Sequence, residues 1–300
     1  WGESPSQNHT LDIGVGRLPV KTPAEAKTVV DKIISYDSDK NNYGRWRKDI
    51  VFIADDGNTS DGFTSAHQSQ ANSLSESIEL IHPTFDTKKI FLVTYTKTTM
   101  PTGEVVPEAN KDITSWFDRG ALITNYTGHG NERLWADEKI LTDVDIEALE
   151  NKHYPFMVTA TCEFGRQDDA TLVSSAELSL IQANGGTIGL VTTARPVNSA
   201  TNFLLNQEFY AALFQKESNR YITIGEVFRR TKNSSNSGVS NRNFSLLADP
   251  SMTLALPSDR ISVSSLKTLN GNDTIKALST VVITGEILDE SGTRNDSFNG

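Results

Sequence analysis

Two residues that could do nucleophilic chemistry, His129 and Cys162, each follow an apolar, strand-like run. Residues 121–127 lead into the Gly-His-Gly triplet at 128–130, and residues 155–161 lead directly into Cys162. Short β-rich runs bounded by turn residues are typical of buried strands in parallel sheets. Functional groups in such sheets gather beyond the carboxyl ends of the strands. The pattern therefore predicts a thiol nucleophile and its base at one sheet edge, which is the chemistry of a cysteine peptidase.

The backbone around these two side chains has a predicted role of its own. The glycines that flank His129 let the chain approach a ligand closely. We expect the N–H groups of Gly130 and Cys162 to point at a substrate carbonyl oxygen and so to form an oxyanion hole. Each residue also has a plainer interpretation, since a lone cysteine is usually a small buried residue and a histidine between glycines can simply cap a turn.

A carboxylate that would orient the imidazole is expected after the run 50–54, which ends in Asp55 and Asp56 before Gly57. Because this run is another predicted strand, it delivers both acids to the same sheet edge. The alternative interpretation is an acidic turn or a helix cap. The residue types alone leave the choice between the two aspartates open.

A calcium loop is a competing interpretation of the same segment. Starting from Asp56, oxygen-bearing residues follow at Asn58 and Ser60. The glycine comes one place late, at Gly62, and His67 stands where the bidentate glutamate belongs. The match is weak, and His67 is of interest mainly because it follows the acidic loop closely.

Motifs for metals and nucleotides are missing from the sequence. It contains no CxxC, no HExxH and no histidine pair at helical spacing, and neither a GxGxxG nor a P-loop lysine motif. His9, His82 and His153 stand in polar or helix-end settings, which are typical of solvated or capping side chains. We expect no metal and no cofactor in the chemistry.

Composition sets the outer limits of the function. The 300 residues are 37% apolar and 22% charged, as in an ordinary soluble globular chain. The net charge of −10 argues against nucleic acid as a partner, because phosphate binding needs a basic face. A single cysteine excludes an internal disulfide. The chain shows no signal-peptide pattern and no run near the ~20 apolar residues that span a bilayer, and we expect it to be a fragment of a longer protein.

Strand-like and helix-like runs alternate as far as residue 256. The expected strands are 12–18, 50–54, 89–95, 121–127, 155–161 and 187–193. The expected helices are 24–36, 65–81, 110–117, 143–149, 176–183, 200–214 and 222–231. Such alternation predicts βαβ units and hence an α/β domain, with a mostly parallel sheet and helices on both faces.

The pattern changes after residue 257. The runs 261–266, 274–278 and 281–288 are β-rich, and turn residues separate them. This predicts the first strands of an Ig-like β-sandwich that is cut off before it closes. We therefore divide the chain into a domain at 1–256 and the start of a sandwich at 257–300.

Several segments, in matching order, closely resemble the gingipain-type cysteine peptidases of family C25. The segments that carry the similarity are 16–19, 125–130, Trp135, 160–162, Gly165 and 248–251. The resemblance extends through most of residues 11–257. It implies a caspase-like α/β fold, a Cys–His dyad and no metal in the chemistry.

The same resemblance implies roles for individual residues. The nucleophile falls on Cys162, the base on His129, and the oxyanion donors on the backbone of Gly130 and Cys162. The acidic third member falls on Asp56, with Asp55 as the reserve candidate. The domain at 1–256 then resembles a gingipain-type peptidase domain that lacks its N-terminal part.

The tail resembles the type IX secretion sortases within this family, through residues 273–278, 285–286 and 298–300. That resemblance implies removal of a C-terminal sorting domain from cargo proteins and attachment of the cargo to lipopolysaccharide. It also implies an outer-membrane partner protein and a place at the cell surface of a Gram-negative bacterium. A secreted endopeptidase that only hydrolyses, and a non-catalytic scaffold with a peptidase fold, are the alternatives.

Overall fold

The computed structural model describes residues 10–39, 42–57, 66–101, 103–235, 239–268, 275–289, 291–296 and 298. The chain divides into two compact units. The first comprises Trp1–Gln215 and Ile222–Ala255, and the second comprises Lys216–Tyr221 and Leu256–Gly300. None of the helices among the described residues is both long and apolar enough to cross a bilayer.

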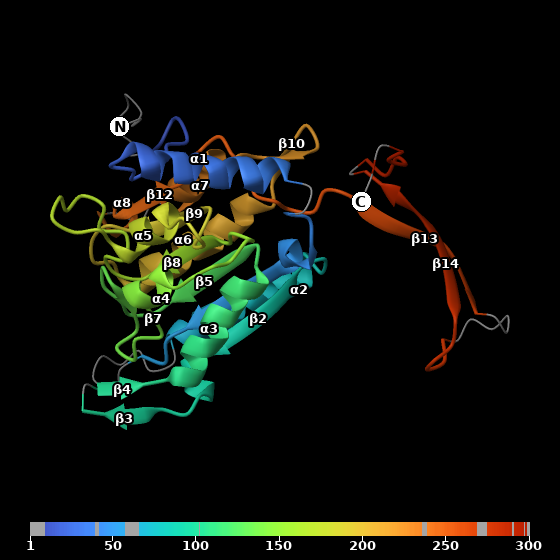
Figure 1. Ribbon diagram of the computed structural model, residues 1–300. Coiled ribbons are helices and arrows are strands. Elements are labelled where there is room, and N and C mark those ends of the chain that lie inside the picture. The colour runs from blue at the N-terminus through green and yellow to red at the C-terminus, as the bar shows by residue number, and fades with distance from the viewer. Residues whose placement is uncertain are drawn as a thin grey trace. The chain divides into compact units, whose positions relative to one another are not determined.

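A six-stranded sheet forms the centre of the first unit (Figure 1), in the order β12-β9-β8-β5-β1-β2. The strands are β1 (Asp49–Ala54), β2 (Asp86–Phe91), β5 (Ile123–Thr127), β8 (Phe156–Ala160), β9 (Gly189–Thr193) and β12 (Phe244–Leu247). All neighbouring pairs are parallel except β12 with β9, which is antiparallel. The predicted α/β class with a mostly parallel sheet is confirmed.

Helices cover both faces of this sheet, and β1, β5, β8 and β9 are buried at every residue as a result. One face packs on α1 (Pro23–Ser38), α3 (Pro107–Arg119), α4 (Asp143–Glu147) and α5 (Ser175–Ile181). The other packs on α2 (Ala66–Ile81) and α6 (Ser199–Leu213), and α6 carries α7 (Ile224–Ser234) and α8 (Val239–Arg242). Side chains alternate along β1, so Val51 and Ile53 join the core on the first face while Phe52 contacts Tyr210 of α6 on the second.

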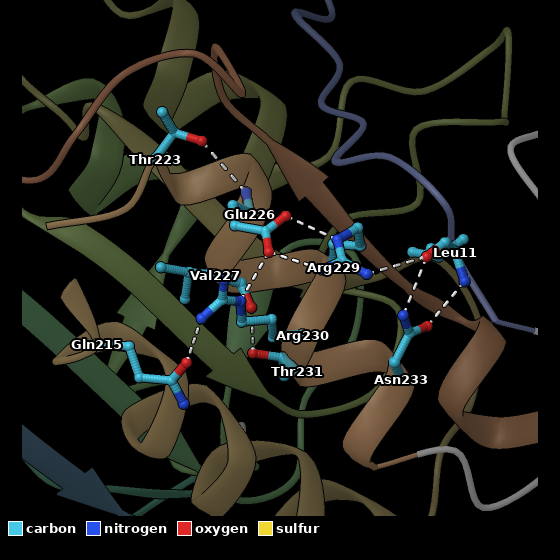
Figure 2. Close-up of polar contacts among 9 residues, drawn as sticks. All are labelled: Leu11, Gln215, Thr223, Glu226, Val227, Arg229, Arg230, Thr231 and Asn233. Atoms are coloured by element: carbon cyan, nitrogen blue, oxygen red, sulfur yellow. Dashed lines mark hydrogen bonds and ion pairs between the residues drawn. The ribbon is translucent and has the colours of Figure 1, made fainter. Parts of the chain in front are cut away.

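The predicted strand at 12–18 does not form. This segment is attached to the rest of the unit by scattered bonds, among them Arg17 N–H to the carbonyl of Leu246 at 2.9 Å. The side-chain amide of Asn233 in α7 takes the place of a strand partner, since it accepts from Leu11 N–H at 2.7 Å and donates to the Leu11 carbonyl at 3.0 Å. Figure 2 shows the two bonds between Leu11 and Asn233 beside the contacts of Glu226 in α7.

Other boundaries also differ from the pattern. The strand expected at 89–95 ends at Phe91 and continues as a 3-10 turn, Leu92–Thr94. Two small antiparallel hairpins were not predicted. They are β3 (Thr98–Met100) with β4 (Gly103–Val105), and β6 (Leu134–Trp135) with β7 (Leu141–Thr142). Such short strands carry too few residues to show a period in sequence.

The second unit contains two antiparallel pairs, β10 (Lys216–Glu217) with β11 (Arg220–Tyr221), and β13 (Arg260–Thr268) with β14 (Val281–Leu288). The strand expected at 274–278 is wrong for 275–278, which form no strand, and Thr274 lies outside the described residues. The Ig-like sandwich and the domain division at 256 stay predictions.

Candidate active site

His129 lies two residues beyond β5, and its backbone is fixed on both sides. Its N–H donates to Oδ2 of Asp55 at 2.9 Å. Its carbonyl accepts from the hydroxyl of Tyr126 at 2.6 Å and from Ala136 N–H at 2.9 Å. The Tyr126 ring in turn stacks on the buried ring of Trp135, with centroids 4.4 Å apart. These bonds hold the loop that carries the imidazole in one place.

Gly128 is required at its position because no space exists for a side chain. A Cβ there would lie 2.3 Å from Cβ of Asp55 and 2.4 Å from the Tyr126 hydroxyl. Real Cβ atoms essentially never approach other atoms so closely. The glycine thus lets the carboxyl end of β5 pass directly against Asp55.

Cys162 lies two residues beyond β8, the strand next to β5. Thr127 and Ala160 are paired in register, so His129 and Cys162 leave the same sheet edge from neighbouring strands, which run about 4.8 Å apart. The thiol is partly buried, and its Sγ accepts from Val197 N–H at 3.5 Å. Val197 precedes α6, and no motif in the sequence predicts its contact with the sulfur.

The loops that carry His129 and Cys162 are in direct contact. A Cβ on Gly130 would lie 2.6 Å from Oγ1 of Thr161, the residue before Cys162. The backbone of Gly130 therefore lies against the side chain of Thr161. The roles of the Gly130 and Cys162 N–H groups as oxyanion donors stay predictions.

The backbone just past the thiol is unusual. Glu163 has φ +56°, in the left-handed region that non-glycine residues seldom adopt. Its carboxylate meets Arg166 at 3.5 Å. Residues held in sparsely populated backbone regions cluster at functional sites, where the surrounding structure holds them.

The two aspartates after β1 face different partners. Asp55 is 3% exposed and accepts N–H groups from His129 at 2.9 Å and Gly57 at 3.1 Å. Burial raises the pKa of Asp55, and the bonds from His129 and Gly57 and the nearby His129 charge oppose that rise. The structure thus brings Asp55, the reserve candidate, to His129.

The carboxylate of Asp56 is paired with a lysine. Its Oδ2 pairs with Nζ of Lys97 at 2.9 Å, and the same ammonium pairs with Glu138 at 2.6 Å and Glu104 at 3.3 Å. A carboxylate oxygen of Asp55 still lies within 4.8 Å of one of Asp56 and one of Glu138, so the two aspartates are close together and differ in their partners. The bond from His129 N–H favours the reserve candidate Asp55, and the assignment of the acidic member stays a prediction.

His67 is the site residue that sequence reasoning placed least well. It is the second residue of α2, is 5% exposed, and its ring meets the His129 ring at right angles with centroids 5.1 Å apart. One donor atom each of Asp55, His67 and His129 lies within 4.8 Å of the others. The only signal in the sequence was the short distance from His67 to the acidic loop. The calcium-loop interpretation falls mostly on residues 58–65, outside the described residues.

The sequence matches Peptidase family C25 over residues 2–255. The chain belongs to peptidase family C25. Among curated C25 relatives, gingipain R2 of Porphyromonas gingivalis is 22% identical over 165 residues, which are 55% of this chain and 21% of gingipain R2. Gingipain R1 of the same species is also 22% identical over 165 residues and is covered to 15%. The chain thus spans about a fifth of the length of gingipain R2.

Solved structures show the same fold. The crystal structure of the Arg-specific cysteine proteinase gingipain R (RgpB) aligns with a TM-score of 0.66 at 19% identity, over 86% of this chain and 60% of that one. The complex of Porphyromonas gingivalis RgpB pro- and mature domains aligns with a TM-score of 0.68 at 19% identity, over 86% and 61%. The caspase-like α/β fold implied by the resemblance to C25 is confirmed.

Proposed function

We propose that this chain carries the catalytic domain of a cysteine peptidase, with Cys162 as nucleophile and His129 as its base. The observation that carries the proposal is the contact between the loops after β5 and β8, where Gly130 runs against Thr161. A nucleophile and its base need a shared edge and a backbone donor beside them. Membership of C25 supports the same assignment.

The acylation step follows from this geometry. The imidazole of His129 takes the thiol proton, and the sulfur of Cys162 bonds to the scissile carbonyl carbon of a protein substrate. The carbonyl oxygen becomes an oxyanion that accepts from the N–H groups of Gly130 and Cys162. The C–N bond then breaks, the imidazolium returns its proton to the leaving amine, and a thioester on Cys162 remains.

Asp55 serves this step as a positioning residue. It fixes the backbone of His129 and places a carboxylate beside the ring, which favours the imidazolium that forms during acylation. It takes no proton from the substrate. Lys97 holds Asp56 and Glu138 away from that role by pairing with both.

For the whole protein we propose a type IX secretion sortase at the cell surface of a Gram-negative bacterium. The C-terminal sorting domain would leave as the amine of the acylation step, and an amine of lipopolysaccharide would then displace the Cys162 thiol from the thioester, so that the cargo gains a new amide bond. An outer-membrane partner protein belongs to this proposal. Its support is the resemblance of the tail, of which residues 275–278, 285–286 and 298 are described and 273, 274, 299 and 300 lie outside the described residues.

The test is to incubate the full-length protein with a cargo protein and an amine acceptor and to identify the products by mass spectrometry. Amide-linked cargo supports the sortase. Hydrolysed cargo alone, at saturating acceptor, favours a gingipain-like endopeptidase. If the cargo stays intact although the enzyme is folded and its Cys162 thiol is reduced, the result favours the non-catalytic scaffold. Cys162→Ala is the control, because every product that passes through the thioester disappears with the thiol.

A further inference from the structure

Three potential metal ligands, one of them His129 itself, come together from three separate elements. Asp55 follows β1, His67 begins α2, and His129 follows β5. They converge because α2 packs on both β1 and β5. One carboxylate oxygen and one nitrogen of each ring lie within 4.8 Å of one another. Asp55 and His67 are buried, and His129 is partly exposed.

Two imidazoles and one carboxylate form a donor set suited to a first-row transition-metal dication, with remaining positions for water. Tetrahedral sites place their donors roughly 3.3–3.5 Å apart, as metal–donor bonds of about 2.0–2.2 Å require. The partly exposed ring of His129 can rotate to close the gap that remains. A ligating histidine keeps its second nitrogen for a further partner, so ligation is compatible with other bonds of both rings.

A second group of possible ligands, formed by Asp55, Asp56 and Glu138, lies close by. The ammonium of Lys97 already occupies it, at 2.9 Å from Asp56 and 2.6 Å from Glu138. The lysine ammonium therefore already neutralises the acids of this second group, in place of a metal ion. The cluster of Asp55, His67 and His129 offers softer nitrogen donors, which favour zinc-class metals over calcium or magnesium.

We propose that Asp55, His67 and His129 bind a zinc-class dication, and that the bound metal inhibits the peptidase because it occupies the imidazole needed as base. The claim that a metal binds depends only on the geometry of the three ligands. The claim that the metal inhibits rests on the proposed function. Chelators should then never slow the enzyme, and should restore the rate of a zinc-treated sample.

The binding test uses the full chain, stripped with a chelator and titrated without substrate. Cobalt(II) absorption reports coordination geometry, and calorimetry with Zn²⁺ gives the Kd. We expect Cys162→Ala to bind as the parent does, which separates this site from the thiol. His67→Gln should weaken binding at least ~10-fold, since loss of a second-shell partner alone costs 10–100-fold. His82→Gln, a histidine outside the cluster, is the matched control.

Parent-like binding by His67→Gln, or loss of binding in Cys162→Ala, would overturn the proposal. If His67→Gln fails to fold, an anomalous difference map of the parent grown with Zn²⁺ decides instead. A peak among Asp55, His67 and His129 supports the site, and a peak elsewhere or no peak refutes it. Binding in a chain without peptidase activity leaves the site standing and refutes the proposed function. Binding by an active enzyme whose rate is unchanged refutes the inhibition.

Discussion

Asp55 and Glu226 are both carboxylates that fix a distant segment of chain, yet their surroundings are opposite. Asp55 is almost fully buried and receives neutral N–H donors from His129 and Gly57. Glu226 is about a quarter exposed and receives Arg229 and Arg230 at 2.7 Å (Figure 2). Burial raises the pKa of Asp55, whereas the bonds from Arg229 and Arg230 lower that of Glu226 to about 2.

In our proposal Asp55 positions the catalytic histidine, whereas Glu226 stabilises the structure through its ion pairs with arginines. Around Glu226, Arg229 also reaches the carbonyl of Leu11 and Arg230 reaches Gln215, so the acid organises one cation that ties the amino-terminal segment to α7 and one that ties the segment just after α6 to it. The negative charge of Glu226 is neutralised by the two arginines that it binds. The charge of Asp55 is desolvated instead, which costs stability and is worthwhile where a transient imidazolium forms beside it.

The largest effect in this comparison is expected from Asp55→Asn. The amide oxygen still accepts the His129 N–H, but the charge beside the ring is lost, so kcat/KM should fall about 10–100-fold. The pH profile of kcat/KM should shift as well, which a purely structural defect would not cause. Peptide hydrolysis measured across pH provides both readouts.

Asp56→Asn is the matched control for that prediction, because it differs by one residue and faces Lys97. Its kcat/KM should stay within about threefold of the parent. If Asp56→Asn abolishes activity and Asp55→Asn leaves it unchanged, the acidic member is Asp56, as the resemblance to gingipain-type peptidases implies.

Gly128→Ala should destabilise the fold by about 2–3 kcal/mol, because the new methyl group meets Asp55 and Tyr126 at less than 3.0 Å. Gly103→Ala separates this crowding from backbone strain, since nothing lies within 4 Å of a Cβ there while φ is +115°. It should cost only about 1 kcal/mol. Equal losses in urea denaturation would show that Gly128 is not held by the contacts we describe.

How far the site could be predicted depends on the distance between its parts in sequence. The strands before His129 and Cys162 could be predicted from the sequence, because buried parallel strands are apolar runs whose carboxyl ends meet at one edge of the sheet. Which of the two adjacent aspartates accepts the His129 N–H depends on the local path of the chain after β1, which no apolar pattern reports. His67 reaches His129 only through the path of α2 across the sheet. Packing decides that path, so composition and spacing could not give it.

Lys32 extends the comparison to a buried cation. It is 3% exposed, donates to the carbonyl of Leu180 at 3.0 Å, and burial lowers its pKa to about 7. Between pH 7 and 10.5 the unfolded chain binds a proton that the folded chain lacks, so stability should rise with pH there. Lys32→Met should reduce this slope by up to about 1.4 kcal/mol per pH unit, measured by denaturation at several pH values. The exposed Lys111→Met should leave the slope unchanged, and a parent-like slope in Lys32→Met would contradict us.

The smallest effect is expected from Glu226→Gln. The pKa of Glu226 is lowered, so its stabilisation is complete above pH 4.5 and is lost as pH falls toward about 2. Because the pairs are partly exposed, we expect a loss of only about 1 kcal/mol at pH 7, and a smaller difference from the parent at pH 3. Glu150→Gln, at an exposed position, should be neutral. A loss that does not shrink at pH 3 would mean that packing, and not charge, is what Glu226 provides.

The central claim is that Cys162 carries the acyl group, and one measurement tests it most directly. The full chain is mixed with a peptide ester substrate, quenched in acid within the first turnover and digested for mass spectrometry. The account predicts the added acyl mass on the peptide that contains Cys162, and its disappearance in Cys162→Ala together with turnover. Undiminished turnover in Cys162→Ala, or an acyl group on another residue, would contradict it.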